Sequence, residues 1–371
     1  MNERHNRKIR RLYSSVGILV SVFVVLTILY FTFAGAQHGL RPHPRANLSG
    51  MEKAMQFYGT DLDPKVPVSE YIDRSKPPAA NCRVPITPAE LRYWLENMVC
   101  YHRFTNEEIN AAAGLEIAKI DAVKRRFDIR ADNRPKRAAD APLLVLPYPG
   151  GRHPRIGFLE GAIDPQRETK FSVFTPWDAN SYIVVDVPEA IWSNLGLTYL
   201  AHTHIDTIWT KRGIELEKLE WNRREDGSLD IERRLPNGIA FGVKVRPTKD
   251  AVLMEMWLAN GTDEKLTDLR VQNCVMTKMA KGFEQQTNDN KVLTNPYVAC
   301  RSTDGKRWII TAWEGCHNPW ANDKCPCFHS DPKFPDLEPG QKGTLRGWLS
   351  FYEGEDIEAE FARIEATGWR R

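Results

Sequence analysis

The clearest pattern of hydrophobic and polar positions lies between Leu235 and Met276. Apolar side chains there alternate with smaller or charged ones in three successive runs, at 239–246, 252–259 and 269–275. A turn sequence, Asn260-Gly261, separates the second run from the third. Alternation with a period of two residues, interrupted by Asn-Gly, is typical of antiparallel strands joined by a short turn. The segment therefore predicts an antiparallel sheet, and it indicates no particular reaction.

Further short apolar runs, bounded by Pro, Gly, Asn and Asp, extend this pattern on both sides. We expect strands at 182–187, 197–209, 308–313 and 345–352. Regular spacing of short strands between turn signals is typical of a β-sandwich. The sequence therefore predicts a large antiparallel β-sandwich over 142–356, followed by a C-terminal helix and tail over 357–371.

Helical patterns occupy the segment before the strands, 85–130. Thr87 and Glu90 form a capping box at the start of a first helix,. Thr105 and Gly114 mark the start and the end of a second helix,. The order of helix, TNEEI turn and helix resembles the helix-turn-helix units of bacterial regulators. The other interpretation is a small helical subdomain that packs beside the sheet or on a partner.

The N-terminus combines a basic tail, 1–15, with an uncharged apolar run, 16–36. About 20 apolar residues are enough to cross a bilayer core as a helix. Lys and Arg are more frequent before this run than just after it, which places the N-terminus in the cytoplasm and the body outside. We therefore expect a single-pass signal-anchor in the cell membrane, a linker over 37–84, and a periplasmic or extracellular body.

A cleaved signal peptide is the alternative for this segment. Ala34-Gly35-Ala36 has the A-x-A form of a cleavage site,. Under either interpretation the body is exported to a compartment that permits disulfides.

The charge balance narrows the choice of partners. The 371 residues include 51 Lys and Arg and 48 Asp and Glu, which gives a formal net charge of +3. Proteins whose main partner is nucleic acid usually have a strongly basic field. The composition therefore argues against nucleic acid, and leaves the membrane, a glycan or another envelope protein as the expected partners.

The segment from Ala251 to Met276 resembles a strand pair of the galactose-mutarotase-like supersandwich of carbohydrate-active enzymes. In that fold an alternating strand ends in an Asn-x-Thr turn, as Asn260-Gly261-Thr262 does here. The resemblance implies a sandwich fold, with a His as acid and a Glu as base at the anomeric carbon, and assigns neither to a position in this chain. Over its whole length the chain also resembles envelope proteins of planctomycete-type bacteria, which implies no activity.

The sequence His202-Thr203-His204-Ile205-Asp206 is the sharpest local pattern. In a strand, residues two apart point to the same face, so His202, His204 and Asp206 would share one face,. Two imidazoles and a carboxylate on one face could bind a divalent metal or act as an acid/base set. A polar outer face of a strand is the third interpretation.

A Gly- and Pro-bounded stretch after residue 150 concentrates opposite charges. Arg155 and Arg167 could bind a carboxylated or phosphorylated ligand, because the guanidinium fork matches such groups,. Glu160 and Glu168 are candidate catalytic carboxylates beside a sugar. A surface network of ion pairs is the alternative interpretation.

Five metal-binding or disulfide-forming residues cluster between 316 and 329, where we expect one long, irregular, Pro-rich loop. They are Cys316, His317, Cys325, Cys327 and His329. Thiols and imidazoles of this number could hold a soft metal ion tetrahedrally. In an exported protein a disulfide from Cys316 to Cys325 or Cys327 competes with that site, and Cys82 with Cys100 is a second expected pair. We expect Cys274 and Cys300 to be thiols in the core.

An aromatic and basic face is expected on the strand at 345–352. Arg346, Trp348 and Tyr352 share one face there and could stack on and hydrogen-bond a sugar ring. Aromatic rings are also the bulkiest core residues, so burial in the core is the alternative.

These patterns together predict an exported α+β protein. Its expected parts are an N-terminal transmembrane helix, a small helical subdomain and a large antiparallel β-sandwich. The expected function is the binding or processing of carbohydrate in the cell envelope. Two alternatives stay open: a non-catalytic module that binds another envelope protein, and a metal-dependent enzyme that uses His202, His204 and Asp206.

Overall fold

The computed structural model describes residues 67–78, 81–155, 167–202 and 205–371. All of them belong to one structural unit. The basic tail, the predicted anchor, most of the predicted linker, Glu160 and His204 lie outside the described residues. In the part of the chain that is described, no helix is long and apolar enough to cross a bilayer.

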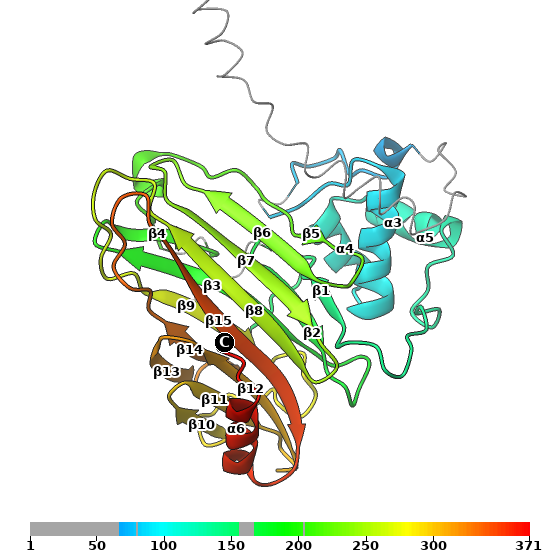
Figure 1. Ribbon diagram of the computed structural model, residues 1–371. Helices are drawn as coiled ribbons and strands as arrows, with labels where there is room; N and C mark the ends of the chain where they lie inside the picture. The colour runs from blue at the N-terminus through cyan, green and yellow to red at the C-terminus, as the bar shows by residue number, and fades with distance from the viewer. Residues whose placement is uncertain (1–66, 79–80, 156–166, 203–204) are drawn as a thin grey trace, which may run out of the picture. The chain divides into compact units, whose positions relative to one another are not determined.

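Two antiparallel sheets form most of the described chain (Figure 1). Among the described residues the first sheet has seven strands. In spatial order they are β1 (Val145–Pro147), β2 (Lys170–Phe174), β3 (Tyr182–Ser193), β9 (Val271–Met276), β14 (Cys327–Pro332) and β13 (Cys316–Asn322), with β4 (Gly196–Leu200) paired to β3.

The second sheet has eight strands within the described ranges. In spatial order they are β10 (Lys291–Thr294), β11 (Tyr297–Arg301), β12 (Arg307–Trp313), β15 (Lys342–Glu353), β8 (Ala251–Ala259), β7 (Ala240–Pro247), β6 (Leu229–Arg234) and β5 (Asn222–Arg223). The alternation predicted at 252–259 is confirmed, because burial along β8 alternates between buried and half-buried positions after Val252.

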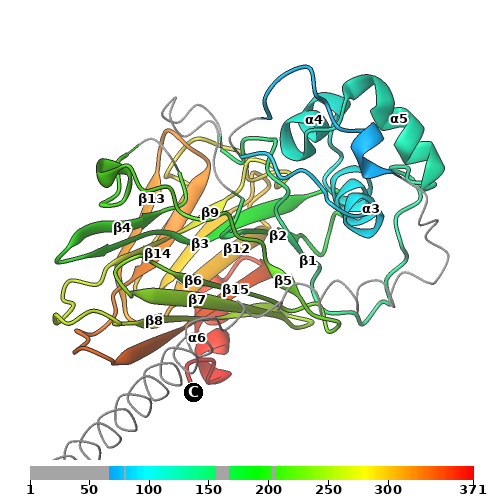
Figure 2. The same ribbon diagram turned by 90° about the horizontal axis from the view of Figure 1, so that it is seen from above.

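The main hydrophobic core lies between the two sheets, which Figure 2 shows as stacked layers. Val185 and Phe328 reach it from the seven-stranded sheet, and Met256 and Leu349 from the eight-stranded sheet. Since side chains alternate along a strand, the neighbours of Val185 and Phe328 point to the opposite face. The candidate site lies on that opposite face, which is called here the outer face of the seven-stranded sheet.

The helical segment forms its own small core beside the sheets (Figure 1). It contains η1 (Val68–Glu70), α3 (Pro88–Glu96), a π-helical turn η2 (Asn97–Tyr101), α4 (Asn106–Ala113) and α5 (Ile117–Arg126). The predicted caps are confirmed. The Thr87 side chain accepts from the Glu90 N–H, and Thr105 and Glu108 form a reciprocal capping box,. Gly114 ends α4 at φ 65°, a left-handed conformation that favours glycine,.

The C-terminal helix, α6 (Ile357–Ala366), covers the outer side of the eight-stranded sheet (Figure 2). Trp348 is 6% exposed and packs there with Phe361 and Trp369. The Arg346, Trp348 and Tyr352 face is therefore a surface that a helix covers. This corrects the prediction that Trp348 stacks on a sugar, and favours the core interpretation.

Two local predictions are wrong. The strand expected at 197–209 ends at Leu200, where β4 ends. His202 and Asp206 therefore lie beyond the strand, and the argument from strand alternation does not apply to them. The irregular loop expected at 316–329 is a β-hairpin made of β13 and β14. Its strands place Cys316, Cys327 and His329 at fixed register positions.

Candidate functional site

A row of chemically active side chains crosses the outer face of the seven-stranded sheet. Lys170 pairs across strands with Asp186, and Asp186 pairs with Cys274. The pairing of Phe328 with Val275 places His329 beside Cys274,. Four neighbouring strands thus bring a cation, a carboxylate, a thiol and an imidazole into one line, although these residues are far apart in the sequence.

The first members of this row form a buried ion pair. Lys170 Nζ lies 2.8 Å from Asp186 Oδ2, and both side chains are 0% exposed. The Thr169 hydroxyl donates to Asp186 Oδ1 at 2.7 Å, and Lys170 Nζ donates to the Ala201 carbonyl at 3.4 Å. These hydrogen bonds compensate the two charges for the loss of water.

A register shift in β3 creates the second part of the site. The shift falls between Asp186 and Ala190 and allows Glu189 to point towards three polar partners,. Glu189 Oε1 lies 2.8 Å from His202 Nε2 and 3.2 Å from Arg155 Nη1. Gln272 Nε2 donates to Glu189 Oε2 at 2.8 Å. Arg155, Glu189 and His202 are each no more than 3% exposed.

The protonation states follow from burial and from the neighbouring charges. Burial, together with the charge of Lys170, lowers the pKa of His202 to about 4, so its imidazole is neutral at pH 7,. Burial opposes the charge of Glu189, but His202 and Arg155 hold the pKa of Glu189 well below its ordinary value,. The centre therefore combines a carboxylate, a neutral imidazole and a guanidinium.

One ring nitrogen of His202 has two competing partners. Nε2 lies 2.8 Å from Glu189 Oε1, which can only accept, and 2.9 Å from Arg155 Nη2, which can only donate,. With a proton on Nε2 the ring donates to Glu189, and without that proton it accepts from Arg155. Transfer of this proton exchanges one hydrogen bond for the other, a property suited to a general acid or base.

Thiols and a second imidazole occupy the adjoining part of the outer face. The ligand atoms of Cys274, Cys327 and His329 all lie within 4.8 Å of one another. Trp320 stacks on the His329 ring at 3.9 Å between centroids, and its Nε1 donates to Asp331 Oδ2 at 2.6 Å. Burial raises the pKa of Asp331 to about 8,.

The structure separates the residues that the sequence grouped together. His202 and Arg155 meet at the Glu189 centre, and no described contact brings Asp206 to it. Asp206 is exposed, and its Oδ1 accepts from Thr210 Oγ1 at 3.2 Å. The predicted set of His202 and Asp206 on one strand face is therefore not formed in the described residues.

Arg167 and Glu168 belong to a different group of ion pairs. Glu168 is 2% exposed and accepts from Arg83 Nη2 at 3.0 Å, and Arg233 Nη2 lies 3.3 Å from its other oxygen. Arg167 pairs with Glu220 at 2.5 Å. The network interpretation of this charged stretch therefore fits Arg167 and Glu168, although the network is buried rather than on the surface.

The hairpin register excludes the predicted disulfides of Cys316. Cys316 pairs with Pro332 at one end of the hairpin, and Cys327 pairs with Asn322 at the other. Five residues of strand span about 16 Å, which is too far for a disulfide. His317 is exposed and lies at the Cys316 end, with its Nδ1 2.9 Å from the Asp331 carbonyl oxygen. All seven cysteines, which include Cys82 and Cys100, are free thiols and buried.

Sequence reasoning did not identify Glu189, Asp186, Lys170 or Gln272 as members of a site, and it placed Cys274 in the core. One signal was available for Asp186. It is the single acid within the apolar run from Tyr182 to Val187, and a charge in a strand buried on both faces needs a partner,. The partner itself depends on strand pairing.

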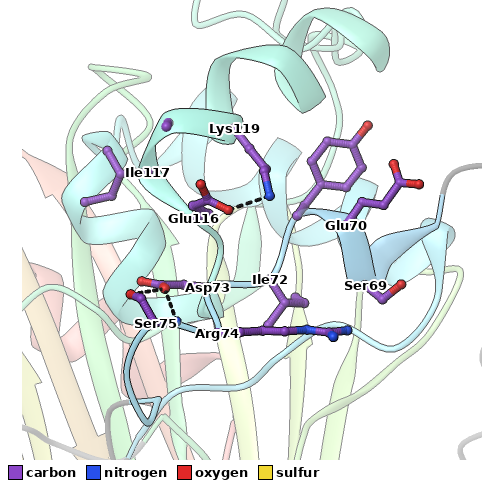
Figure 3. Close-up of a pocket in the computed structure, with 11 residues that line it drawn as sticks. Ser69, Glu70, Ile72, Asp73, Arg74, Ser75, Glu116, Ile117 and Lys119 are labelled. Atoms are coloured by element: carbon purple, nitrogen blue, oxygen red, sulfur yellow. Dashed lines mark hydrogen bonds and ion pairs between the residues drawn. The ribbon is translucent and has the colours of Figure 1, made fainter.

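An open cavity lies on the helical segment and away from the outer face. It is a groove of about 900 Å³ lined by residues 69–75 and 116–119. Figure 3 shows the ion pair of Glu116 with Lys119 and the hydrogen bond of Asp73 with Ser75 on its sides. Glu116 and Asp73 are thus already paired, and no residue of the Glu189 centre lines this groove.

Comparison with known proteins gives weak structural likenesses only. No protein-family model matches the chain, and no curated protein matches it. A candidate kojibiose phosphorylase from the human microbiome is 8% identical, with 51% of this chain and 26% of that chain covered and a TM-score of 0.30. A polysaccharide lyase is 13% identical, with 59% of this chain and 33% of that chain covered and a TM-score of 0.30.

A candidate aldose 1-epimerase from Escherichia coli K12 is 13% identical, with 47% of this chain and 84% of that chain covered and a TM-score of 0.29. This chain spans about a third or less of the length of the phosphorylase and the lyase. The three named neighbours are carbohydrate-active proteins. At TM-scores of this size they assign no activity to this chain and no role to its residues.

Proposed function

We propose that the protein binds or processes carbohydrate at the outer face of the seven-stranded sheet. The observation that carries the proposal is the buried contact of Glu189 with His202 at 2.8 Å, beside Arg155. A carboxylate and a neutral imidazole in hydrogen-bond contact can remove a proton from a hydroxyl or ring carbon and return it.

The surrounding polar groups suit a ligand rich in hydroxyls. Each hydroxyl can both donate and accept. Lys170, Arg155 and Gln272 supply donors on this face, and Asp186 and Glu189 supply acceptors. A sugar that enters this centre would exchange hydrogen bonds with the same groups that now satisfy one another.

A glycan screen with a matched pair of Glu variants tests the proposal. We expect the wild-type protein to bind or convert at least one glycan. Loss of the carboxylate in Glu189→Gln should lower the turnover of that glycan about 100-fold or more. The control is Glu232→Gln, an exposed position on β6, which should behave like wild type.

Two results contradict the proposal. One is the absence of any bound or converted glycan in a screen that covers neutral and acidic sugars. The other is a Glu189→Gln protein that is folded by circular dichroism and still binds or converts the glycan as well as wild type.

We propose further that the protein is a single-pass membrane protein with its body outside the cytoplasm. The support is the apolar run at 16–36 with basic residues before it,. Protease protection in intact cells tests this topology: the body should be cut from outside, while a tag placed before residue 16 should be protected. The glycan ligand, or an envelope protein in the alternative function, would then be met outside the cytoplasm.

A further inference from the structure

The thiols and imidazole beside the Glu189 centre form a second site with its own chemistry. Cys274 comes from β9, and Cys327 and His329 come from β14. Their ligand atoms lie within 4.8 Å of one another, and the three residues are at most 1% exposed. In a tetrahedral zinc site, sulfur ligands lie about 2.3 Å and nitrogen ligands about 2.0 Å from the ion. Ligand atoms this close together need only a small inward shift to reach those distances.

The imidazole of His329 is the observation that points to a metal-binding role. Its ring is buried, and neither Nδ1 nor Nε2 has a partner at hydrogen-bond geometry among the described residues. The Asn273 backbone acts on the ring only weakly, since its effect on the His329 pKa is smaller than that of burial. The nearest carboxylate oxygen, Asp331 Oδ1, lies 3.8 Å from Nδ1, which is too far for a hydrogen bond,. Buried polar atoms without a partner are rare in native proteins and costly. A metal ion bound to one ring nitrogen would remove part of this cost.

The surroundings of His329 hold the imidazole ring in one orientation. Trp320 stacks on the imidazole with an interplanar angle of 11° and thereby fixes the plane of the ring,. The Arg155 guanidinium interacts electrostatically with Cys274, Cys325 and Cys327, and its positive charge offsets only part of the rise of the Cys274 thiol pKa to about 12 that burial causes,. Cys325 is fully buried and hydrogen-bonds to the Cys327 thiol, so a third thiol is adjacent.

We infer that Cys274, Cys327 and His329 bind one soft metal ion of the kind that prefers thiolate and imidazole ligands, with zinc as the expected ion. Two thiols and one imidazole match zinc and copper(I), and they exclude magnesium and calcium, which prefer oxygen ligands. Binding releases the two thiol protons to solvent as the sulfur–metal bonds form. The inference is independent of the proposed carbohydrate function, because it uses none of the groups of the Glu189–His202 pair.

The site replaces the metal set that the sequence suggested. His329 and Cys327 remain, whereas Cys316 and His317 lie at the far end of the hairpin. Cys274 enters from a strand that is distant in the sequence. A disulfide between Cys274 and Cys327 is the competing use of the same sulfur atoms, and the experiment below distinguishes the two.

Metal content and cobalt spectroscopy of the purified full-length protein test the inference. We expect about one equivalent of bound zinc or copper per chain by elemental analysis. After removal of the ion, added cobalt(II) should give thiolate-to-cobalt charge-transfer absorption and the visible bands of a tetrahedral site. Wild-type protein suffices for this readout, so the inference stays testable even if a buried variant fails to fold.

Variants identify the ligands. Cys274→Ser, Cys327→Ser and His329→Asn should each lower the affinity for cobalt(II) at least 10-fold. Cys316→Ser and His317→Gln are matched controls, since they remove the same groups from the other end of the same hairpin, and they should bind as wild type. A metal-free protein without cobalt absorption would overturn the inference. So would a count of free thiols that falls by two because Cys274 and Cys327 are oxidised to a disulfide, or a loss of binding in the two controls.

Discussion

The buried imidazole of His102 is one of the contacts that join the helical segment to the seven-stranded sheet. Its Nδ1 donates to the Asn97 carbonyl at 3.0 Å, so its Nε2 must accept from the Ser172 hydroxyl at 2.7 Å,. Burial lowers the pKa of His102 to about 3, from an ordinary value of 6.5,. A proton on Nε2 would reverse the bond with Ser172 and would place a buried positive charge near Arg152 and Arg134, so the folded protein keeps this ring neutral,.

This depressed pKa predicts a loss of stability in acid. Below pH 6.5 the unfolded chain takes up a proton that folded His102 does not, so the stabilisation present above pH 6.5 is lost as the pH falls towards 3,. The slope approaches about 1.4 kcal/mol per pH unit for this one group. Between pH 7 and pH 5, urea unfolding of wild type should therefore lose about 2 kcal/mol more than that of His102→Asn. If the free energy of unfolding changed with pH in the same way in both proteins, the depressed pKa assigned to His102 would be contradicted.

The ion pair of Lys170 with Asp186 predicts a large cost for removing one charge only. Asp186→Asn leaves the Lys170 ammonium buried without its counter-ion, which should lower the free energy of unfolding by about 3–5 kcal/mol,. Asp230→Asn is the control, because its partner Arg224 is 58% exposed, and it should cost about 1 kcal/mol or less. Denaturant unfolding of both variants measures the loss of unfolding free energy in each. Similar losses in the two variants would argue against a buried ion pair.

Two strands of the eight-stranded sheet depend on a glycine that accommodates a tryptophan ring. A Cβ added at Gly347 on β15 would lie 2.7 Å from ring atoms of Trp313, and one at Gly242 on β7 would lie 2.7 Å from the ring of Trp257. Real Cβ atoms do not approach so closely. The indole of Trp313 belongs to the main core, so it has little freedom to move,.

Gly347→Ala should therefore lower stability through overpacking. The expected loss is about 1–3 kcal/mol, because the Trp313 ring or the strand must shift. Thr344→Ala lies on the same strand at an exposed position and should cost less. Thermal unfolding of the two variants measures the difference, and equal melting temperatures would show that the ring moves away freely.

At the scale of elements, the sequence predicts what local rules determine. The N-caps at Thr87 and Thr105 and the alternation along β8 depend on neighbours within a few residues, and the structure confirms them. The full capping box predicted at Thr87 is not formed, because Glu90 accepts from the N–H of Ile86 instead of that of Thr87. The end of β4 at Leu200 and the β13–β14 hairpin were predicted incorrectly, because pairing with distant strands decides both. No local pattern marks where a pairing partner stops.

The candidate site was predictable only in part for the same reason. His202 and Arg155 were identified from residue type and local density of charge. Glu189 belongs to the site because the pairing of β3 with β9 shifts register next to it. Cys274 belongs to it because β9 lies between Asp186 on β3 and the strand β14. A sequence pattern contains no information on cross-strand registers between segments this far apart, so the Glu189 centre and the thiol–imidazole site required the structure.

At the scale of the whole described unit, Arg152 holds the helical segment on the sheet. Its guanidinium binds both oxygens of Glu108 on α4, at 2.5 and 2.6 Å, and donates to the His102 and Arg103 carbonyls at 2.8 and 3.0 Å. From the sheet side, the Tyr182 hydroxyl on β3 accepts from Arg152 at 3.0 Å. The helical segment and the sheet have separate hydrophobic cores, so polar contacts of this kind couple their stabilities.

Removing this guanidinium should loosen the helical segment more than the sheets. In Arg152→Met, Glu108 loses a half-buried partner, at an expected cost of about 2–3 kcal/mol,. That cost should appear as faster hydrogen exchange, about 30-fold or more, for amides in α3, α4 and α5, with β8 and β15 little changed. The control Arg92→Met removes a guanidinium that pairs with Glu96 within α3 and does not reach the sheet, so it should leave exchange in α4 and α5 nearly unchanged. If Arg152→Met instead accelerated exchange equally in helices and sheets, the two cores would unfold as one cooperative unit, and Arg152 would stabilise the whole rather than a junction within it.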